Sequence, residues 1–178
     1  MRRRWAIGIS FLWLGCSTAS PDLIVQQEFF KTEGKRILIQ YFDLNPMTAT
    51  EVHKPSVAKF GETLALDIQQ YLRLAHFQKT LVIAPAEPAR GDILIQGAIT
   101  HLAGGNQTYR MLLDLFGFGG THVAVKGQVI DLADSKTILD FSLSRRSHYT
   151  WKNNEQAVRE NLREIAQEIA RAVIESSP

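Results

Sequence analysis

The sequence has a single cysteine, Cys16, among its 178 residues. One thiol cannot close a disulfide within the chain, and it cannot supply the several cysteines of a zinc–thiolate site. Stability must therefore come from a hydrophobic core. About 160 residues follow Cys16, which is enough for one domain with a substantial core of its own.

Long apolar runs and an excess of one charge are also missing beyond residue 16. No later run approaches the roughly 20 apolar residues that a membrane-spanning helix needs. The whole chain has a formal net charge of +2, but three of its 20 basic residues are Arg2, Arg3 and Arg4. Without them, 17 basic residues face 18 acidic ones, a net charge of −1. This balance gives no electrostatic reason to expect a nucleic-acid partner.

The motifs of common active sites are missing as well. The sequence contains no G-x-S-x-G nucleophile elbow, no H-E-x-x-H zinc helix and no G-x-x-x-x-G-K-[ST] phosphate loop. The carboxylates between Asp131 and Thr137 lack the ligand spacing of a calcium loop. We therefore expect a protein that is not an enzyme and that needs neither a metal nor a cofactor.

The five histidines give no metal-ligand spacing on a predicted helix. Strand alternation places His101 on the apolar side of its strand, whereas His122 has the opposite parity to Val123 and Val125. A metal site shared by these two residues is therefore not expected. We interpret all five as surface or hydrogen-bonded residues: His53, His76, His101, His122 and His148.

A basic and apolar leader begins the chain. The uncharged stretch Trp5–Leu14 follows the arginines and has the length of a signal-peptide core, although it is too short to span a bilayer. Gly15 and Cys16 then resemble the cleavage site of a bacterial lipoprotein signal. The large residues Trp13 and Leu14 depart from the usual pattern, which has a leucine and a small residue there.

This interpretation makes residues 1–15 a signal peptide and Cys16 a lipidation site that carries fatty chains such as palmitate. A single chain anchors weakly, but two or three on one cysteine hold stably. Ser17, by resemblance to enterobacterial lipoproteins, favours the periplasmic face of the outer membrane. Two alternatives stay open: cleavage after Ala19 to give a soluble periplasmic protein, and a buried core cysteine, which is disfavoured inside a cleavable segment.

The remaining sequence predicts a tether over residues 16–35 and a single α+β domain over residues 36–178. Amphipathic helices are expected over Ser56–Ala75 and Asn154–Glu175, each with an apolar stripe at helical spacing. An edge strand is possible over Leu23–Phe30. Further strands are predicted over residues 36–42, 77–84, 92–102, 121–131 and 137–144.

The alternation of the last two strands, with a turn at Asp131–Ser135, indicates an antiparallel hairpin. We therefore expect a mostly antiparallel sheet with both helices packed on one of its faces.

Two polar or glycine-rich segments have open interpretations. Residues 104–120 read GGNQTYRMLLDLFGFGG, and no helix follows the glycines, so a phosphate cradle is rejected. The stretch Met111–Phe118 either fills the core or contacts a partner or the membrane. In the second case the contact residues are Arg110, Leu112, Leu115, Phe116 and Phe118. Arg145 and Arg146 mark a solvated strand end or a contact to a phosphate or lipid headgroup.

Several of these features together resemble a known family. They are Gly97, the pair Tyr109–Arg110, the glycine-rich connector Gly117–Gly120 and the strand that ends at Asp131. The run resembles small bacterial envelope lipoproteins known only as a domain of unknown function (DUF family four-four-one-zero). More distantly, it is similar to periplasmic domains of the curli-secretion-channel lipoprotein and of transport-auxiliary lipoproteins. The resemblance implies no catalytic residues.

The first functional hypothesis is a non-enzymatic, lipid-anchored envelope protein that serves assembly or transport. It would bind a partner protein through a sheet edge or through residues 111–118. An enzyme without a recognisable motif is the second, and a cleft that gathers titratable groups would favour it. A lipid- or glycan-binding carrier is the third, and an enclosed apolar cavity between helices and sheet would favour it.

Overall fold

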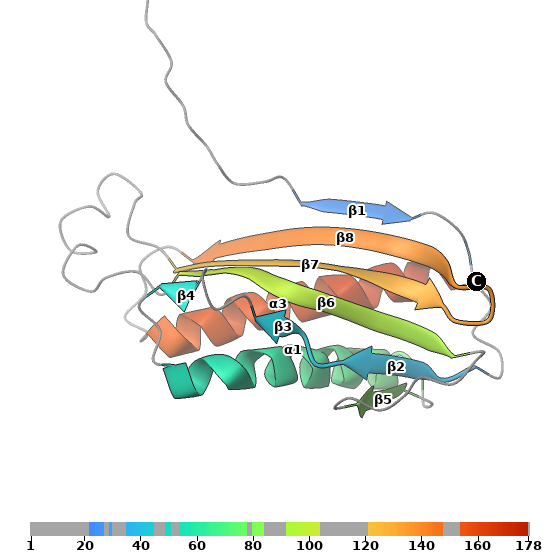
Figure 1. Ribbon diagram of the computed structural model, residues 1–178, viewed down its shortest axis with the longest axis horizontal. Helices are drawn as coiled ribbons and strands as arrows, with labels where there is room; N and C mark the ends of the chain where they lie inside the picture. The colour runs from blue at the N-terminus through green and yellow to red at the C-terminus, as the bar shows by residue number, and fades with distance from the viewer. Residues whose placement is uncertain are drawn as a thin grey trace, which may run out of the picture.

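The architecture is that of a computed structural model, which describes residues 22–26, 29, 35–44, 49–50, 54–77, 80–83, 92–103, 121–147 and 154–177. Within these residues the chain forms one sheet with helices on one side (Figure 1). The strands are β1 (Leu23–Gln26), β2 (Ile37–Gln40), β3 (Asp43–Leu44), β4 (Ala49–Thr50), β5 (Thr80–Ile83), β6 (Ile93–Ala103), β7 (Thr121–Asp131) and β8 (Lys136–Ser147). The helices are α1 (Lys54–Leu74) and α3 (Asn154–Glu175). The predicted α+β class is confirmed.

The sheet has a long antiparallel part and a shorter parallel part. The strand order is β1-β8-β7-β6-β2-β5, and β3 and β4 also pair with β6. The ladders β1–β8, β8–β7 and β7–β6 are antiparallel. Strands β2 and β5 are parallel, because α1 lies between them in the chain and returns it to the same end of the sheet.

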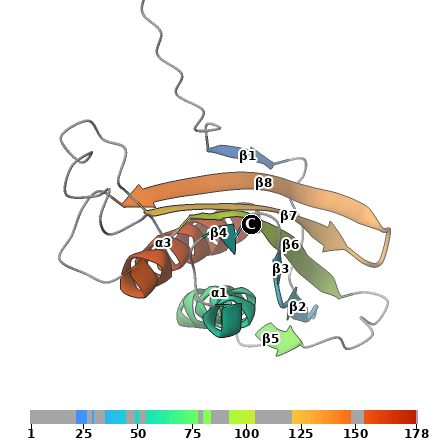
Figure 2. The same cartoon turned by 60° about the vertical axis from the view of Figure 1, so that its left-hand side comes forward.

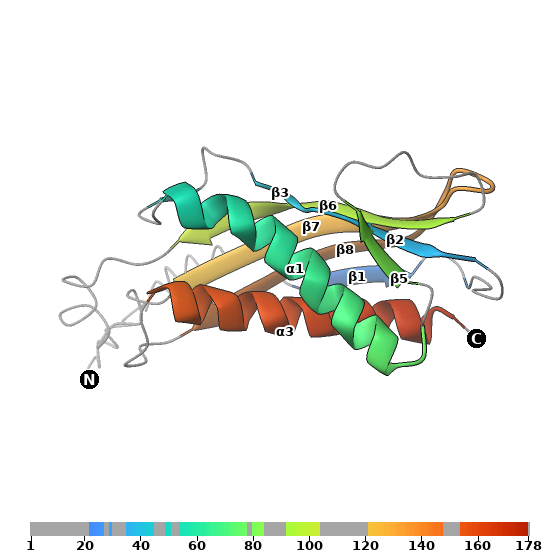
Figure 3. The same cartoon turned by 90° about the horizontal axis from the view of Figure 1, so that it is seen from below.

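Both helices cover the same face of the sheet and cross one another beneath it (Figures 2 and 3). Their stripes are fully buried at Phe60, Leu64, Ile68 and Leu72 of α1, and at Val158, Leu162, Ile165, Ile169 and Val173 of α3. The helix-facing positions of β6, β7 and β8 complete this core. Both predicted stripes are confirmed at these positions. Neither described helix combines the length and apolar character that a membrane span requires.

Two glycines allow aromatic rings to pack against the middle of the sheet. Gly97 of β6 and Gly127 of β7 are direct cross-strand partners. A Cβ atom at Gly97 would lie 2.7 Å from the Phe42 ring, and one at Gly127 would lie 2.5 Å from the Phe141 ring. The two rings contact each other with their centroids 6.4 Å apart. The glycines therefore create the space in which Phe42 and Phe141 meet.

Polar contacts fix the ends of the strands. The guanidinium of Arg36 donates to both carboxylate oxygens of buried Asp92, at 3.0 and 2.7 Å. This fork joins the start of β2 to the start of β6. Lys35 forms an ion pair with Asp131 at the end of β7, and the same carboxylate accepts from the Ala133 amide in the predicted hairpin turn. Because β7 and β8 pair antiparallel on either side of this turn, the predicted hairpin is confirmed.

Candidate functional site: the open face of the sheet

Neither described helix covers the other face of the sheet, whose central positions carry polar side chains. We call this the open face (Figure 2). Its central row contains Gln96 of β6, Gln128 of β7 and Asp140 of β8, which are successive cross-strand partners. Gln40 extends the row, because it follows Ile39, the partner of Ile95. Three amide side chains therefore lie side by side, at the strand spacing of about 4.8 Å.

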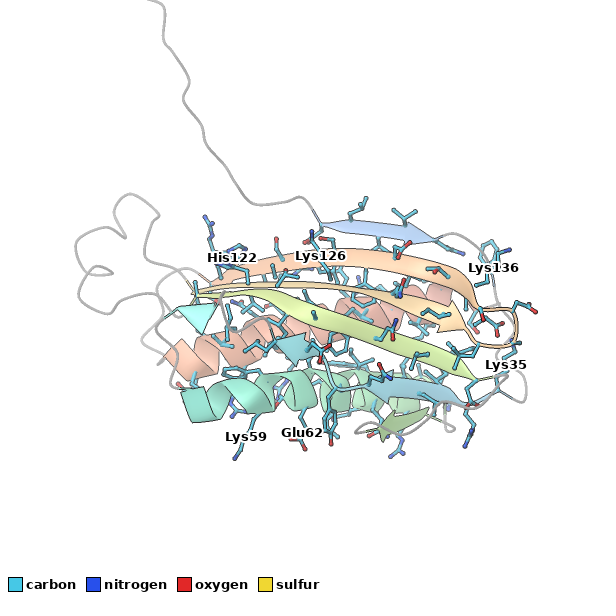
Figure 4. All side chains as sticks on the ribbon, in the orientation of Figure 1. Lys35, Lys59, Glu62, His122, Lys126 and Lys136 are labelled. Atoms are coloured by element: carbon cyan, nitrogen blue, oxygen red, sulfur yellow. The ribbon has the colours of Figure 1, made fainter. Side chains whose placement is uncertain are left out.

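A groove of about 740 Å³ runs over this row. Tyr41, Asp43 and Lys126 are its exposed lining side chains, and Asp43 supplies a carboxylate. The groove can donate and accept hydrogen bonds, and it carries one charge of each sign. Its full lining is Gln40, Tyr41, Asp43, Gln96, Gly97, Ala98, Lys126, Gly127 and Gln128. Figure 4 shows Lys126 in the middle of the open face.

A pair of histidines lies on the same face toward one end of the sheet. The rings of His101 in β6 and His122 in β7 have centroids 4.7 Å apart. The sequence-based prediction that these residues lie on opposite faces is wrong. The ladder between β6 and β7 shifts its register between Ile99 and His101, so Ile99 pairs with Val125 whereas His101 pairs with Ala124. This bulge changes the parity of β6 and turns His101 to the open face.

Burial and nearby positive charge both change the pKa of one member of this pair, His122. The pKa of His122 is lowered from its ordinary value of 6.5, first because the ring is partly buried, and then because His101 and Arg146 are close. Arg146 is the direct cross-strand partner of His122 and is exposed. The three side chains therefore form a small cluster of basic groups at the end of the open face.

The two adjacent arginines of β8 have different surroundings. Arg145 points to the helix side, where it pairs with Asp22 before β1 and with Glu168 of α3, and its Nε lies 3.7 Å from Glu164. Arg146 points to the open face beside His122. Arg145 is therefore an ion-pair residue within the fold, which neither interpretation of the arginine pair anticipated, and both interpretations stay open for Arg146.

A second groove of about 390 Å³ lies between β1 and the last turns of α3. Ile24 and Gln26 of β1 line one side, and Glu168, Arg171 and Glu175 of α3 line the other. Strand β1 itself confirms part of the edge strand proposed for residues 23–30. Its outward side chains Leu23 and Val25 are exposed by 56% and 42%. An apolar edge therefore lies next to the open face.

The site residues proposed from the sequence lie outside the described residues. These are Gly15 and Cys16 of the leader, and the contact candidates Arg110, Leu112, Leu115, Phe116 and Phe118. Sequence analysis missed the glutamine row, although Gln40, Gln96 and Gln128 all have the parity opposite to their strand's buried stripe. Comparing these parities across strands would have found it. Within the described part of the chain, no three His, Cys, Asp or Glu side chains come together as metal ligands.

A family model described as a domain of unknown function (DUF4410) matches residues 30–156. The chain belongs to the DUF4410 family. The resemblance drawn from Gly97, Tyr109–Arg110 and Gly117–Gly120 is therefore confirmed. No curated protein sequence matches the chain.

Several solved structures are similar to this DUF4410 protein at low sequence identity, and the first two below share its fold. The PelC dodecamer from Paraburkholderia phytofirmans has a TM-score of 0.54 and 11% identity, and the match covers 82% of this chain and 96% of that one. Protein XCC0632 from Xanthomonas campestris has a TM-score of 0.51 and 9% identity, with 80% and 85% covered. A minor lipoprotein from Acinetobacter baumannii has a TM-score of 0.43 and 14% identity, with 78% and 91% covered.

Proposed function

We propose that this DUF4410 protein is a non-enzymatic, lipid-anchored module of the bacterial cell envelope that docks a partner protein on the open face of its sheet. The observation that carries the proposal is the polar groove over Gln40, Gln96 and Gln128, on the face that neither described helix covers. A surface of amides with one lysine and one aspartate fits a polar partner surface, because each amide both donates and accepts.

The position of β1 supports anchoring beside this face. Asp22 is held by the Ser144 amide at 2.7 Å and by Arg145. Cys16 precedes Asp22 by six residues, so an acyl group on its sulfur would attach close to the edge of the sheet. Ser17 favours the outer membrane as the destination. Cleavage after Ala19 is the alternative, and it would release the protein into the periplasm.

The anchoring half of the proposal is tested by the N-terminus of the purified protein. We expect a chain that begins at Cys16 with acyl mass, and we expect Cys16→Ala to leave the membrane fraction or to stall as an unprocessed precursor. Mass spectrometry and fractionation measure both. A mature chain that begins at Ser20 without acyl mass contradicts anchoring but leaves the docking surface to be tested by itself.

The docking half is tested by photocrosslinking in intact cells. A photoreactive residue at Gln128, in the groove, should give a discrete crosslinked product, and Lys126→Glu should weaken it. The same probe at Lys59, an exposed position on α1, is the matched control. Equal products from both positions would contradict docking on the open face. A product only from a probe at Phe116 would instead assign the contact to residues 111–118.

A homo-oligomer is the second candidate, and the edges of the sheet favour it. Strands β1 and β5 end the strand order, and they run in opposite directions. The β5 edge of one copy could therefore pair antiparallel with the β1 edge of the next, a head-to-tail contact that closes into a ring when its rotation permits. The similar PelC structure is described as a dodecamer. Native mass spectrometry should then show an oligomer with one defined number of chains. We expect Val25→Lys to dissociate this oligomer. A wild-type protein that is only monomeric would contradict this candidate.

The carrier hypothesis receives less support from the described residues than the enzyme hypothesis. The larger groove gathers Tyr41, Asp43 and Lys126, the kind of titratable cluster that favours an enzyme, although amides and glycines make up most of its lining. It also lies on the open face, not between the helices and the sheet, where an apolar carrier cavity was expected.

A further inference from the structure

We propose that His101, His122 and Arg146 form a binding site for an oxyanion, such as a phosphate group, and that the site binds more tightly when its histidines are protonated. The inference goes beyond the proposed docking role, since it concerns the end of the open face rather than the central groove. Each claim can therefore fail without the other.

The first argument is the arrangement of donors. Each protonated imidazole offers two N–H groups, and the guanidinium offers a planar set of five. His101 and His122 have ring centroids 4.7 Å apart, and Arg146 is the direct cross-strand partner of His122. All three come from the same face of three neighbouring strands. His122 lies on the strand between the other two, so an oxyanion bound beside it would meet donors from neighbouring strands.

The second argument is charge. Among the described residues, no ion pair joins an acidic side chain to Arg146, His101 or His122. The preceding residue, Arg145, by contrast pairs with three carboxylates. Lys126 is the next charged group on β7 and has the same sign. Along β8 the nearest open-face neighbour of Arg146 is the uncharged Ser144. A bound anion would supply a negative charge that none of the ion pairs among the described residues gives to these side chains.

The third argument is the mutual effect of the three groups. Burial, His101 and Arg146 all lower the pKa of His122. An anion bound beside the rings would offset the two electrostatic contributions and favour the imidazolium. By linkage, an anion that raises the pKa of a histidine binds more tightly as the pH falls through that pKa. A divalent metal is a poorer fit, because the described residues add no third ligand to the pair.

The β-bulge explains why the site exists at all. Without the register shift between Ile99 and His101, residue 101 would face the helices. With the shift, the two rings contact each other on the open face of the sheet. The bulge therefore re-aims one side chain toward its partner, a role that bulges often have beside functional sites.

The test follows the histidine ring protons by NMR as the pH is lowered from 7.5 to 5.5. The protein is purified from membranes and reconstituted in phosphatidylcholine nanodiscs, and His101→Asn and His122→Asn assign the signals. Sulfate is the probe, since its charge stays constant over this range, and chloride at equal ionic strength controls for screening. We expect sulfate to raise both midpoints by about half a pH unit and to bind about tenfold more tightly at pH 5.5 than at pH 7.5.

Two variants and a change of lipid make the test specific. Arg146→Gln should abolish the sulfate effect, and Lys59→Gln, which removes a positive charge from α1, should leave it unchanged (Figure 4). Midpoints that rise in phosphatidylglycerol nanodiscs without sulfate identify the ligand as a lipid headgroup, whereas a response to sulfate alone identifies a free oxyanion. Midpoints that neither sulfate nor phosphatidylglycerol moves, or an Arg146→Gln variant that responds like the wild type, overturn the proposal.

Discussion

Gly97 shows how a single missing side chain shapes the sheet. A Cβ atom there would lie 2.4 Å from the Lys126 carbonyl oxygen and 2.7 Å from the Phe42 ring, so both strand and ring would have to move. We expect Gly97→Ala to lower the free energy of unfolding by about 1–3 kcal/mol, measured by urea denaturation. Ala98→Ser, whose side chain lies on the open face, is the control and should change it by less than about 0.5 kcal/mol. Equal effects would contradict this account of the glycine.

His122 makes the stability of the fold depend on pH. Its pKa in the folded chain is below 6.5, because of burial and of the charges on His101 and Arg146. Below pH 6.5 the unfolded chain therefore binds more protons than the folded one, and the free energy of unfolding falls as the pH drops through the folded pKa.

Replacing this histidine should remove part of that dependence. We expect the urea midpoint of His122→Asn to change less between pH 7.5 and pH 5 than that of the wild type in chloride buffer. Asp67 acts in the opposite sense, since burial raises the pKa of its carboxyl from 3.8, but both proteins carry Asp67 and its contribution cancels in the comparison. An identical change in both proteins would show that His122 does not titrate differently on unfolding.

At the scale of the elements, Arg145 holds β1, β8 and α3 together. It pairs with Asp22 and Glu168, and Glu164 is nearby. Partly exposed pairs of this kind contribute about 0.2–1 kcal/mol each. We expect Arg145→Gln to let β1 separate more often, so that amides of Ile24–Gln26 exchange with deuterium about tenfold faster. Arg163→Gln, on the exposed side of α3, should not alter this exchange, and faster exchange throughout the sheet would contradict a local role.

The elements differ in how far their sequence could predict them. Helix α3 and strand β7 have the predicted bounds, because long periodic stripes and clear turns define them. The parallel pairing of β2 with β6 and β5 could not be predicted in the same way, since a short strand buried on both faces carries no parity signal. The bulge before His101 could not be predicted from the sequence either. It changes the register by one residue, and no glycine or proline stands at Thr100 to mark it.

The candidate site was therefore only partly accessible from the sequence. The sequence indicated Arg145 and Arg146 as one pair. Which of the two faces the helices and which faces the open side depends on their pairing with β7. The histidine pair depends on the bulge, and the amide row depends on the alignment of three strands that are distant in the sequence. Each of these is a property of pairing between strands rather than of any one segment.

At the scale of the whole molecule, anchoring through Cys16 would place one part of the sheet near the bilayer. Asp22 follows Cys16 by six positions and β1 begins one residue later, so the Cα atom of an acylated Cys16 would lie at most about 25 Å from the start of β1. Leu23 pairs with Ser142, whereas Asp134 in the hairpin turn precedes Ser142 by eight residues, and the stretch of β8 from Lys136 to Ser142 spans about 20 Å at strand spacing. The hairpin should therefore be further from the membrane than the middle of β8.

This geometry can be measured by energy transfer to a dye in the bilayer. An acylated Cys16 does not react with thiol probes, so a cysteine introduced as Ser142→Cys or Asp134→Cys is labelled alone. We expect more efficient transfer from position 142 than from position 134, and we expect a flexible insertion between Ala19 and Ser20 to reduce the difference, because a longer tether lets the domain turn. If the two positions transfer equally in the uninserted protein, β1 does not hold the sheet beside the anchor, even if the lipid itself is present.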